Sequence, residues 1–372
     1  MLLFFNVISF YAIFAYIFFF LQNFCRGTQT TSKMKLLITK TFLALVFLIQ
    51  GSFAIAQTDL YPAQENGKYG YINKSGKMVI APKFEFAEFF SEGLAGVSID
   101  GKRGFINESG ATVIPFQFDR ITPFSEGLAS GKMNGSWMYF DKTGKVLIES
   151  VCDYAYSFSE GLARLQVGSK MGFINKSGVF VIKPIYDGAY DFSESLARVK
   201  KDNKWGYINK TGSVVISFLF SDCFEFMEGL ANVRMGESEN DKWGFIDKTG
   251  KLVLDIKYDR AWPFSEGLAL IRKGEYSNGR YGYISKSGEV VVSTTLTGGD
   301  YFKDGLACVT SSLDTKNATF QFIDKKGAIL INKNFNYLTT FKNGLAKVSS
   351  NELKEGYVFG YIDKTGKYVW PK

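Results

Sequence analysis

The sequence predicts an all-β fold built from tandem repeats, and three observations support this prediction. The motif aromatic-Gly-aromatic-Ile-Asn/Asp-Lys-Ser/Thr-Gly recurs nine times with small variations and reads WGFIDKTG at residues 243–250. A second motif, Phe-Ser-Glu-Gly-Leu-Ala, recurs in phase between its copies. Helical periodicity is absent. Self-similarity of this kind is the signature of an architecture in which small units stack on one another.

The closing glycines of the first motif set the repeat length. Four intervals of 34 residues are followed by two of 38 and two of 39. The glycines are Gly76, Gly110, Gly144, Gly178, Gly212, Gly250, Gly288, Gly327 and Gly366. The repeats therefore occupy essentially all of the chain beyond residue 57.

Each repeat is predicted to hold three short antiparallel strands. The segments LAxV, WGFID and xxVI are rich in aromatic and β-branched residues, which favour strands. The Lys-Ser/Thr-Gly tripeptide is typical of a hairpin turn, because its glycine accepts positive φ. The stretch xPxYDxAxxF is interpreted as a crossing loop, and Ser-Glu-Gly as the turn into the next LAxV strand. WGFI is apolar at successive positions, so both of its faces should be covered.

The arrangement of the repeats has two readings. The first and last repeats begin and end in phase, so neither terminus donates a strand to complete a unit at the other. Nine blades would also exceed the usual four to eight of a propeller. We therefore expect an open, solenoid-like or superhelical array of nine repeats, with a propeller-like ring as the alternative.

The first 56 residues are predicted to lie outside this fold. Residues 34–56 have a basic start, an apolar run and Ala54-Ile55-Ala56, which is the pattern of a secretory signal peptide cleaved after Ala56. Residues 1–33 are interpreted as an upstream extension from a start codon assigned too early, or as a membrane anchor. Residues 57–372 then form a single repeat array that is secreted, periplasmic or on the cell surface.

Composition excludes several functions. The chain has no histidine, which removes Ser-His-Asp and Cys-His nucleophile pairs and histidine metal ligands. The formal charge is +8, but residues 1–56 hold four basic residues and no acidic one. The remainder has 44 − 4 = 40 basic and 36 acidic residues, a net charge of +4. This mild, interleaved charge argues against nucleic-acid binding. We expect no enzyme activity and no cofactor.

The repeats resemble the WG-repeat family, named for the Trp-Gly pair that stands here as Trp205-Gly206 and Trp243-Gly244. The likeness extends through FIDKTG and FSEGLA and covers about residues 58–372. Met138 and Gln321 replace the motif glycine in two copies. The resemblance implies a bacterial, often exported repeat protein without assigned catalysis.

The aromatic residue that opens each motif could pack between repeats or stack on a sugar. Repeated positions in a stacked array are core positions first, so a packing role is preferred. The aromatic column is Tyr69, Trp137, Trp205, Trp243, Tyr281, Phe320 and Phe359. We assign structural roles in the repeat to Trp137, Trp205, Gly206, Trp243, Gly244, Gly282 and Gly360.

Two acidic columns recur with the repeat. The glutamates of FSEG could be paired carboxylates for hydrolysis, but their regular recurrence favours a turn role. The aspartates after the xPxY segment are expected to cap a turn through their own backbone, and calcium binding lacks a dense D-x-D pattern. The columns are Glu92, Glu126, Glu160, Glu194, Glu228 and Glu266, and Asp119, Asp153, Asp187 and Asp259.

Cysteines give little guidance. Cys152, Cys223 and Cys308 occupy three different positions of the repeat, so no stacked pair follows from them. They are interpreted as buried small residues. One disulfide stays open as an alternative in an oxidising compartment.

Loop length varies in one place only. The segment between the LAxV and WGFI strands has 6 positions from Val199 to Trp205 and grows to 10 or 11 in the last four repeats. All four insertions should project from the same edge of the array. Insertions on one face of a repeat protein often mark its binding face, although neutral drift is the alternative. Candidate binding residues are Glu237, Glu239, Asn240, Tyr276, Asn278, Asp314, Asn317, Glu352 and Tyr357.

These observations favour an exported, non-enzymatic binding or scaffold protein. Its partner is expected to be another protein held at the long-loop edge. The alternative is a carbohydrate-binding module on the cell surface that uses exposed aromatics. Membrane contact is expected only through the export signal or an N-terminal anchor.

Overall fold

The computed structural model describes residues 59–150, 152–236, 241–310, 320–333, 335–350, 353 and 357–371. The predicted signal peptide and its upstream extension lie outside these residues. Contacts divide the chain at residue 57 into two units, and the fold below is that of the second. Its described residues are strands, turns and irregular segments without helix, which confirms the all-β prediction. No helix in the described part of the chain is long and apolar enough to span a bilayer.

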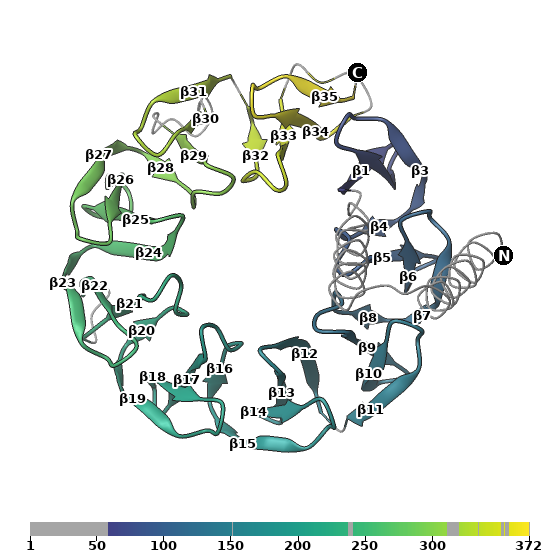
Figure 1. Cartoon of the computed structure of the whole chain (residues 1–372), viewed down its shortest axis with the longest axis horizontal. Helices are drawn as coiled ribbons and strands as arrows, with labels where there is room; N and C mark the ends of the chain where they lie inside the picture. Colours follow the sequence, from purple (N-terminus) through teal and green to yellow (C-terminus); the bar gives the residue numbers. More distant parts are fainter. Residues whose placement is uncertain are drawn as a thin grey trace, which may run out of the picture. The chain divides into compact units, whose positions relative to one another are not determined.

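The described strands form nine small antiparallel sheets, which we number as blades 1 to 9 in chain order. Blade 1 shows three strands and blades 2 to 9 show four each. The blades follow one another around a central opening as a closed ring (Figure 1). The molecule is therefore a nine-bladed β-propeller over its described residues. The ring alternative is confirmed, and the open array preferred from the sequence is not formed.

The strands of each blade run from the central opening outward in chain order. The innermost strands are β4 (Phe86–Ala87), β8 (Arg120–Ile121), β12 (Tyr154–Ser159), β16 (Gly188–Ala189), β20 (Asp222–Cys223), β24 (Arg260–Ser265), β28 (Gly298–Gly299) and β32 (Tyr337–Leu338). The second strands are β1 (Leu60–Glu65), β5 (Leu94–Ile99), β9 (Leu128–Met133), β13 (Leu162–Val167), β17 (Leu196–Lys201), β21 (Ala231–Arg234), β25 (Leu268–Lys273), β29 (Ala307–Thr310) and β33 (Leu345–Ser349).

The third and outermost strands complete each blade. The third strands are β2 (Lys68–Asn73), β6 (Lys102–Asn107), β10 (Ser136–Asp141), β14 (Lys170–Asn175), β18 (Lys204–Asn209), β22 (Trp243–Ile246), β26 (Arg280–Ser285), β30 (Phe320–Ile323) and β34 (Gly360–Asp363). The outermost strands are β3 (Met78–Phe84), β7 (Thr112–Phe118), β11 (Val146–Ser150), β15 (Phe180–Tyr186), β19 (Val214–Phe220), β23 (Leu252–Tyr258), β27 (Val290–Leu296), β31 (Ile329–Asn332) and β35 (Tyr368–Trp370).

The predicted crossing loop contains a fourth strand. In blades 2 to 9 it carries the innermost strand, which pairs with the LAxV strand of the same blade, as Gly188 pairs with Lys200 in blade 5. Most of these strands are only two residues long. So short a strand has no sequence period of its own, and it forms because the second strand offers a free edge.

The core lies between blades. Each hydrophobic cluster joins residues of two neighbouring blades; in one, Trp243 and Phe245 of blade 6 pack with Phe264 and Ile271 of blade 7. The WGFI segment of β22 is buried at all four positions, which confirms that both faces of this strand are covered. The motif glycine has a steric reason, since a Cβ on Gly206 would lie 2.7 Å from the carbonyl oxygen of Ile216 on the adjacent strand.

Side chains close the ring where the sequence offers no donated strand. The hydroxyl of Tyr361 in blade 9 donates to the carbonyl oxygen of Pro62 in blade 1 at 2.9 Å. The amide of Asn343 donates to Asp59 at 2.7 Å, and Trp370 packs in one cluster with blade 1. Side chains also join the other neighbouring blades. Closure therefore does not need a strand exchanged between the two termini, and repeats that start and end in phase can still form a ring.

Candidate binding face

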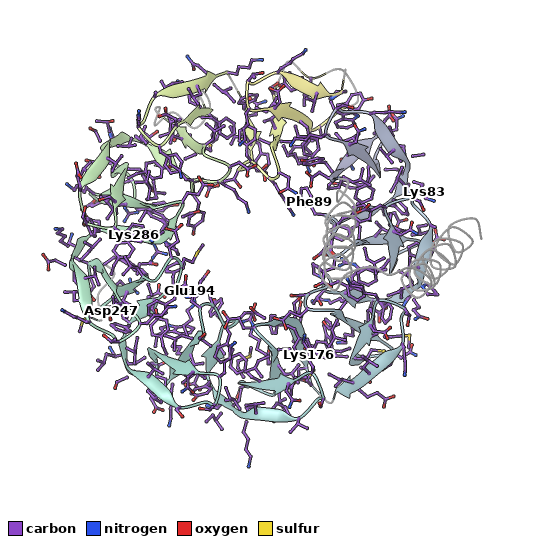
Figure 2. All side chains as sticks on the ribbon, in the orientation of Figure 1. Lys83, Phe89, Lys176, Glu194, Asp247 and Lys286 are labelled. Atoms are coloured by element: carbon purple, nitrogen blue, oxygen red, sulfur yellow. The ribbon has the colours of Figure 1, made fainter. Side chains whose placement is uncertain are left out.

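One face of the ring is formed by the FSEG and Lys-Ser/Thr-Gly turns, which link neighbouring blades. Glu194 in blade 5 has φ 52°, and its carboxylate accepts the backbone N–H of Gly229 in blade 6 at 3.0 Å. The ammonium of Lys248, also in blade 6, lies 3.0 Å from the same carboxylate. Figure 2 places Glu194 beside the central opening.

This contact, which we call the Glu clasp, recurs around the ring. Six glutamates accept a backbone N–H of the next FSEG turn and pair with a lysine of the same next blade: Glu92, Glu126, Glu160, Glu194, Glu228 and Glu266. The glutamates lie in turns as predicted. Their carboxylates bridge blades, a role that the sequence analysis did not foresee.

The opposite face carries the hairpin turns between second and third strands, and we call it the loop face. The aspartates of the YD pair lie here. The carboxylate of Asp187 holds Lys170 of blade 4 at 2.5 Å and accepts the backbone N–H of Asp202 in blade 5 at 3.1 Å. The expectation that these aspartates cap their own backbone is therefore wrong for Asp187. Its donors stand 15 residues downstream and 17 residues upstream, because the chain passes from one blade to the next at this point.

The described strand ends that flank the lengthened loops lie on the loop face, since antiparallel topology places every connection between second and third strands at the same strand ends. Of the candidate binding residues, Tyr276 is 88% exposed and Asn278 is also exposed. Glu237, Glu239, Asn240, Asp314, Asn317 and Glu352 lie outside the described residues. Tyr357 is half-buried, and its hydroxyl donates to Glu65 of blade 1 at 2.7 Å. Tyr357 thus contributes to ring closure.

The motif aromatics do not form an exposed ladder in the described part of the ring. Trp137 and Trp243 are buried, and Trp205 is half-buried. The indole N–H of Trp137 donates to the carbonyl oxygen of Asp153 at the next blade. These side chains pack between blades, so a sugar-stacking surface would have to use other aromatics.

Arginine and aromatic side chains alternate along blades 4 to 7. The guanidinium of Arg164 lies 3.6 Å from the ring centre of Tyr156, and that of Arg198 lies 3.5 Å from Tyr190. Arg260 lies 4.5 Å from Trp243. Such stacking is stabilising when the cation is partly desolvated. The sequence does contain a signal for this series of arginine–aromatic contacts. Six of the eight arginines after residue 57 fall between residues 164 and 280.

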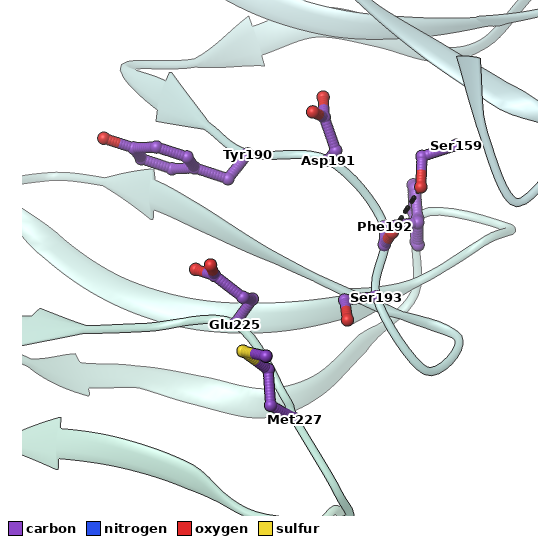
Figure 3. A pocket seen from close by; sticks show the side chains of 7 residues that line it. All are labelled: Ser159, Tyr190, Asp191, Phe192, Ser193, Glu225 and Met227. Atoms are coloured by element: carbon purple, nitrogen blue, oxygen red, sulfur yellow. Dashed lines mark hydrogen bonds between the residues drawn. The ribbon is translucent and has the colours of Figure 1, made fainter. Parts of the chain in front are cut away.

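A cavity of about 360 Å³ opens between blades 5 and 6 on the inner side (Figure 3). Its carboxylates are those of Asp191 and Glu225, each held by an arginine. Arg164 lies 2.9 Å from Asp191, and Arg198 lies 3.5 Å from Glu225. Because each acid is paired with an arginine, we assign both ion pairs a structural role. The lining is completed by Ser159, Tyr190, Phe192, Ser193 and Met227.

The described residues contain no group of three or more Cys, Asp or Glu side chains that could hold a metal ion. Cys152, Cys223 and Cys308 form no disulfide with one another. Burial raises the pKa of the Cys223 and Cys308 thiols to about 12. Cys223 and Cys308 are buried, as expected, and Cys152 is half-buried.

Fold and repeat together define a β-propeller made of WG-type blades. The WG containing repeat family matches eight segments, at residues 69–102, 104–137, 137–170, 171–205, 205–237, 243–276, 281–310 and 322–353. The chain therefore belongs to the WG-repeat family, which confirms the resemblance noted from the motifs. No similar sequence was found among curated proteins.

The solved structures that are similar to this chain are distant from it in sequence. A eukaryotic initiation factor shares 14% identity, with a TM-score of 0.59 over 84% of this chain and 95% of the other. Hsv2 of Kluyvelomyces marxianus shares 9%, with a TM-score of 0.39 over 64% and 91%. A protein of unknown function from Bacteroides caccae shares 12%, with a TM-score of 0.28 over 63% and 89%. The first of these likenesses concerns the fold alone, and the other two support no argument.

Proposed function

We propose that this chain is an exported, non-enzymatic binding module that holds a protein partner on the loop face of blades 6 to 9. The observation behind the proposal is the distribution of loop length. Insertions occur in four consecutive blades, always between the second and third strands, and the ring brings all four to one face. Binding residues are found disproportionately often in loops that a rigid scaffold positions.

The scaffold suits such a role. Inter-blade packing and the Glu clasps hold adjacent turns in place, so that loops of different blades can act on one partner without a large ordering cost. The described loop between β25 and β26 presents Tyr276 to solvent at 88% exposure. Exposed tyrosines are frequent energetic centres of protein interfaces. A carbohydrate ligand is the second candidate, and it would have to use such loop aromatics.

Shortening the four loops tests the proposal. The loops after Arg234, Arg272, Thr310 and Ser349 would be cut to the length found between Val199 and Trp205. A matched control keeps each loop's length but replaces its residues with Gly and Ser. Wild type, trimmed and Gly-Ser proteins serve as baits for the envelope fraction of the source cells, with thermal unfolding to verify the fold.

We expect wild type to capture a protease-sensitive partner that both loop variants lose. Undiminished capture by the trimmed protein would refute the proposal. A captured species that survives protease but is destroyed by periodate would favour the carbohydrate alternative.

A further inference from the structure

Three arginines converge where blades 6 and 7 meet the loop face. Arg234 ends β21, Arg260 begins β24 and Arg272 stands in β25. The guanidinium carbons of Arg234 and Arg260 lie 5.8 Å and 4.5 Å from the ring centre of the same residue, Trp243. Burial lowers the pKa of Arg260, and the positive charges of Arg234 and Arg272 lower it further, against the opposing effect of Asp222. The three cations are therefore close enough to repel one another.

The cluster is short of negative charge. Asp222 approaches Arg260 at 4.0 Å, but no carboxylate among the described residues comes within 4.0 Å of Arg234 or Arg272. The Nε atoms of both arginines are buried and have no hydrogen-bond partner among the described residues. Asp259, which directly precedes Arg260, holds Lys242 and accepts the backbone N–H of Gly274. The charge of Arg272 makes only the smallest of the contributions that lower the pKa of Asp259. Arg164 and Arg198 in blades 4 and 5, by contrast, each have an acidic partner.

The three arginines are half-buried. Partly desolvated cations are stabilised by nearby counter-charges, and arginine geometry suits carboxylates. The cluster lies at the roots of the first two lengthened loops. Beside it stands Tyr276, whose ring centre is 5.6 Å from the Arg272 guanidinium. Trp243 is buried beneath the cluster, so the arginines and the exposed Tyr276 are the side chains that can contact a partner. Arginine and tyrosine are both enriched in interface hot spots. The net charge of +4 beyond residue 56 gives little long-range attraction for a polyanion, which favours a few local carboxylates.

We propose that Arg234, Arg260 and Arg272 form the anchor point for an acidic segment of the protein partner, whose Asp or Glu carboxylates complete the charge balance of this cluster. The inference rests on the proposed function and specifies the chemistry of the partner.

The test measures binding of a fluorescein-labelled hexaglutamate peptide by fluorescence anisotropy at low ionic strength. The variant is Arg234→Gln/Arg272→Gln. Its matched control is Lys132→Gln/Lys200→Gln, because Lys132 and Lys200 occupy the same strand position in blades 3 and 5. Arg234→Lys/Arg272→Lys keeps the charge and removes the planar fork. Thermal unfolding establishes that each variant is folded.

We expect the Gln pair to weaken peptide binding about tenfold or more, the Lys pair to have an intermediate effect, and the control to bind like wild type. Equal binding by the Gln variant and its control would overturn the proposal. If the Gln variant does not fold, the Arg234→Lys/Arg272→Lys variant provides the test. An affinity of this variant for hexaglutamate equal to that of wild type would then overturn the proposal. Absence of hexaglutamate binding by the wild type would also overturn it, and dextran sulfate and inorganic phosphate serve as competitors that report the anion preference of the site.

Envelope capture separates this inference from the function on which it rests. If loop trimming abolishes capture while the Gln variant captures normally, the loop face binds the partner and the arginine anchor is wrong. If neither change affects capture, the proposed function itself fails. If both the trimmed protein and the Gln variant lose capture, the proposed function and the arginine anchor are both supported.

Discussion

Glu88 is a half-buried residue at the start of the crossing segment between β4 and β5. Its Oε2 atom is buried without a hydrogen-bond partner. The space beside it exists because residue 96 is glycine, where a Cβ would lie 2.6 Å from that oxygen. Burial raises the pKa of Glu88 to about 7 from an ordinary value of 4.5, against the opposing effect of Arg103. The neutral acid is the form that this site favours.

Glu88 should therefore make stability depend on pH. Between about pH 4.5 and pH 7 the folded protein keeps a proton that the unfolded chain releases, so stability falls as pH rises through this window. We predict that Glu88→Gln raises the free energy of unfolding at pH 8 by about 2 kcal/mol. The gain should vanish near pH 4.

Urea unfolding at the two pH values measures the effect, with the exposed Glu149→Gln as the control. A gain that is the same at pH 4 and pH 8 would contradict the role assigned to the Glu88 proton.

Residue-scale features such as Glu88 and the arginine cluster were beyond the repeat analysis. They occupy positions that vary from blade to blade, whereas a repeat is recognised from the positions that recur. Position 88 is Glu in blade 2, and its counterparts are Tyr190 in blade 5 and Trp262 in blade 7. Burial at such positions depends on the neighbouring blade. Only the concentration of arginines between residues 164 and 280 was visible in advance.

At the scale of the element, the Glu clasp is the unit that joins one blade to the next. Burial tends to raise the pKa of Glu194, but Lys248 and the Gly229 N–H outweigh it, and the pKa lies below its ordinary value. The ionised form is thus the one that the clasp stabilises. Its stabilisation is present at neutral pH and is lost as pH falls through the lowered pKa.

We predict that Glu194→Ala lowers the free energy of unfolding by about 1–2 kcal/mol, because a backbone N–H and a lysine lose their acceptor. Lys248→Met removes only the partly exposed ion pair and should cost less than about 1 kcal/mol. Glu194→Gly loses the clasp but relieves the positive φ, so its cost should be smaller than that of Ala. Chemical denaturation ranks the three variants. An Ala variant as stable as wild type would show that the clasp is incidental.

The elements themselves were largely predictable. The strands LAxV, WGFI and xxVI are present, and the turns lie at Lys-Ser/Thr-Gly and Ser-Glu-Gly, because side-chain shape and glycine conformation act locally. The innermost strand was not predicted, because its own few residues do not specify a strand. It forms by pairing with the second strand of the blade, which is β5 in blade 2. The partners of Glu194 and Asp187 were missed because they lie in the next blade, and sequence separation alone does not identify them.

At the scale of the whole molecule, the sequence left open whether the array closes. The ring closes only if the small rotations between adjacent described blades add up to a full turn. This total cannot be read from the sequence of any single repeat. Tyr361, Asn343 and Trp370 of blade 9 contact blade 1 directly, so the last interface is built like the others. The closed ring places the arginine cluster and the strand ends before the lengthened loops of blades 6 to 9 on one face.

Electron microscopy of the purified protein tests this closed ring most directly. The account predicts that class averages viewed down the axis show nine lobes around a central opening, with no gap between the first and last. An open arc or spiral with separated ends, or a ring with a different number of lobes, would contradict the account.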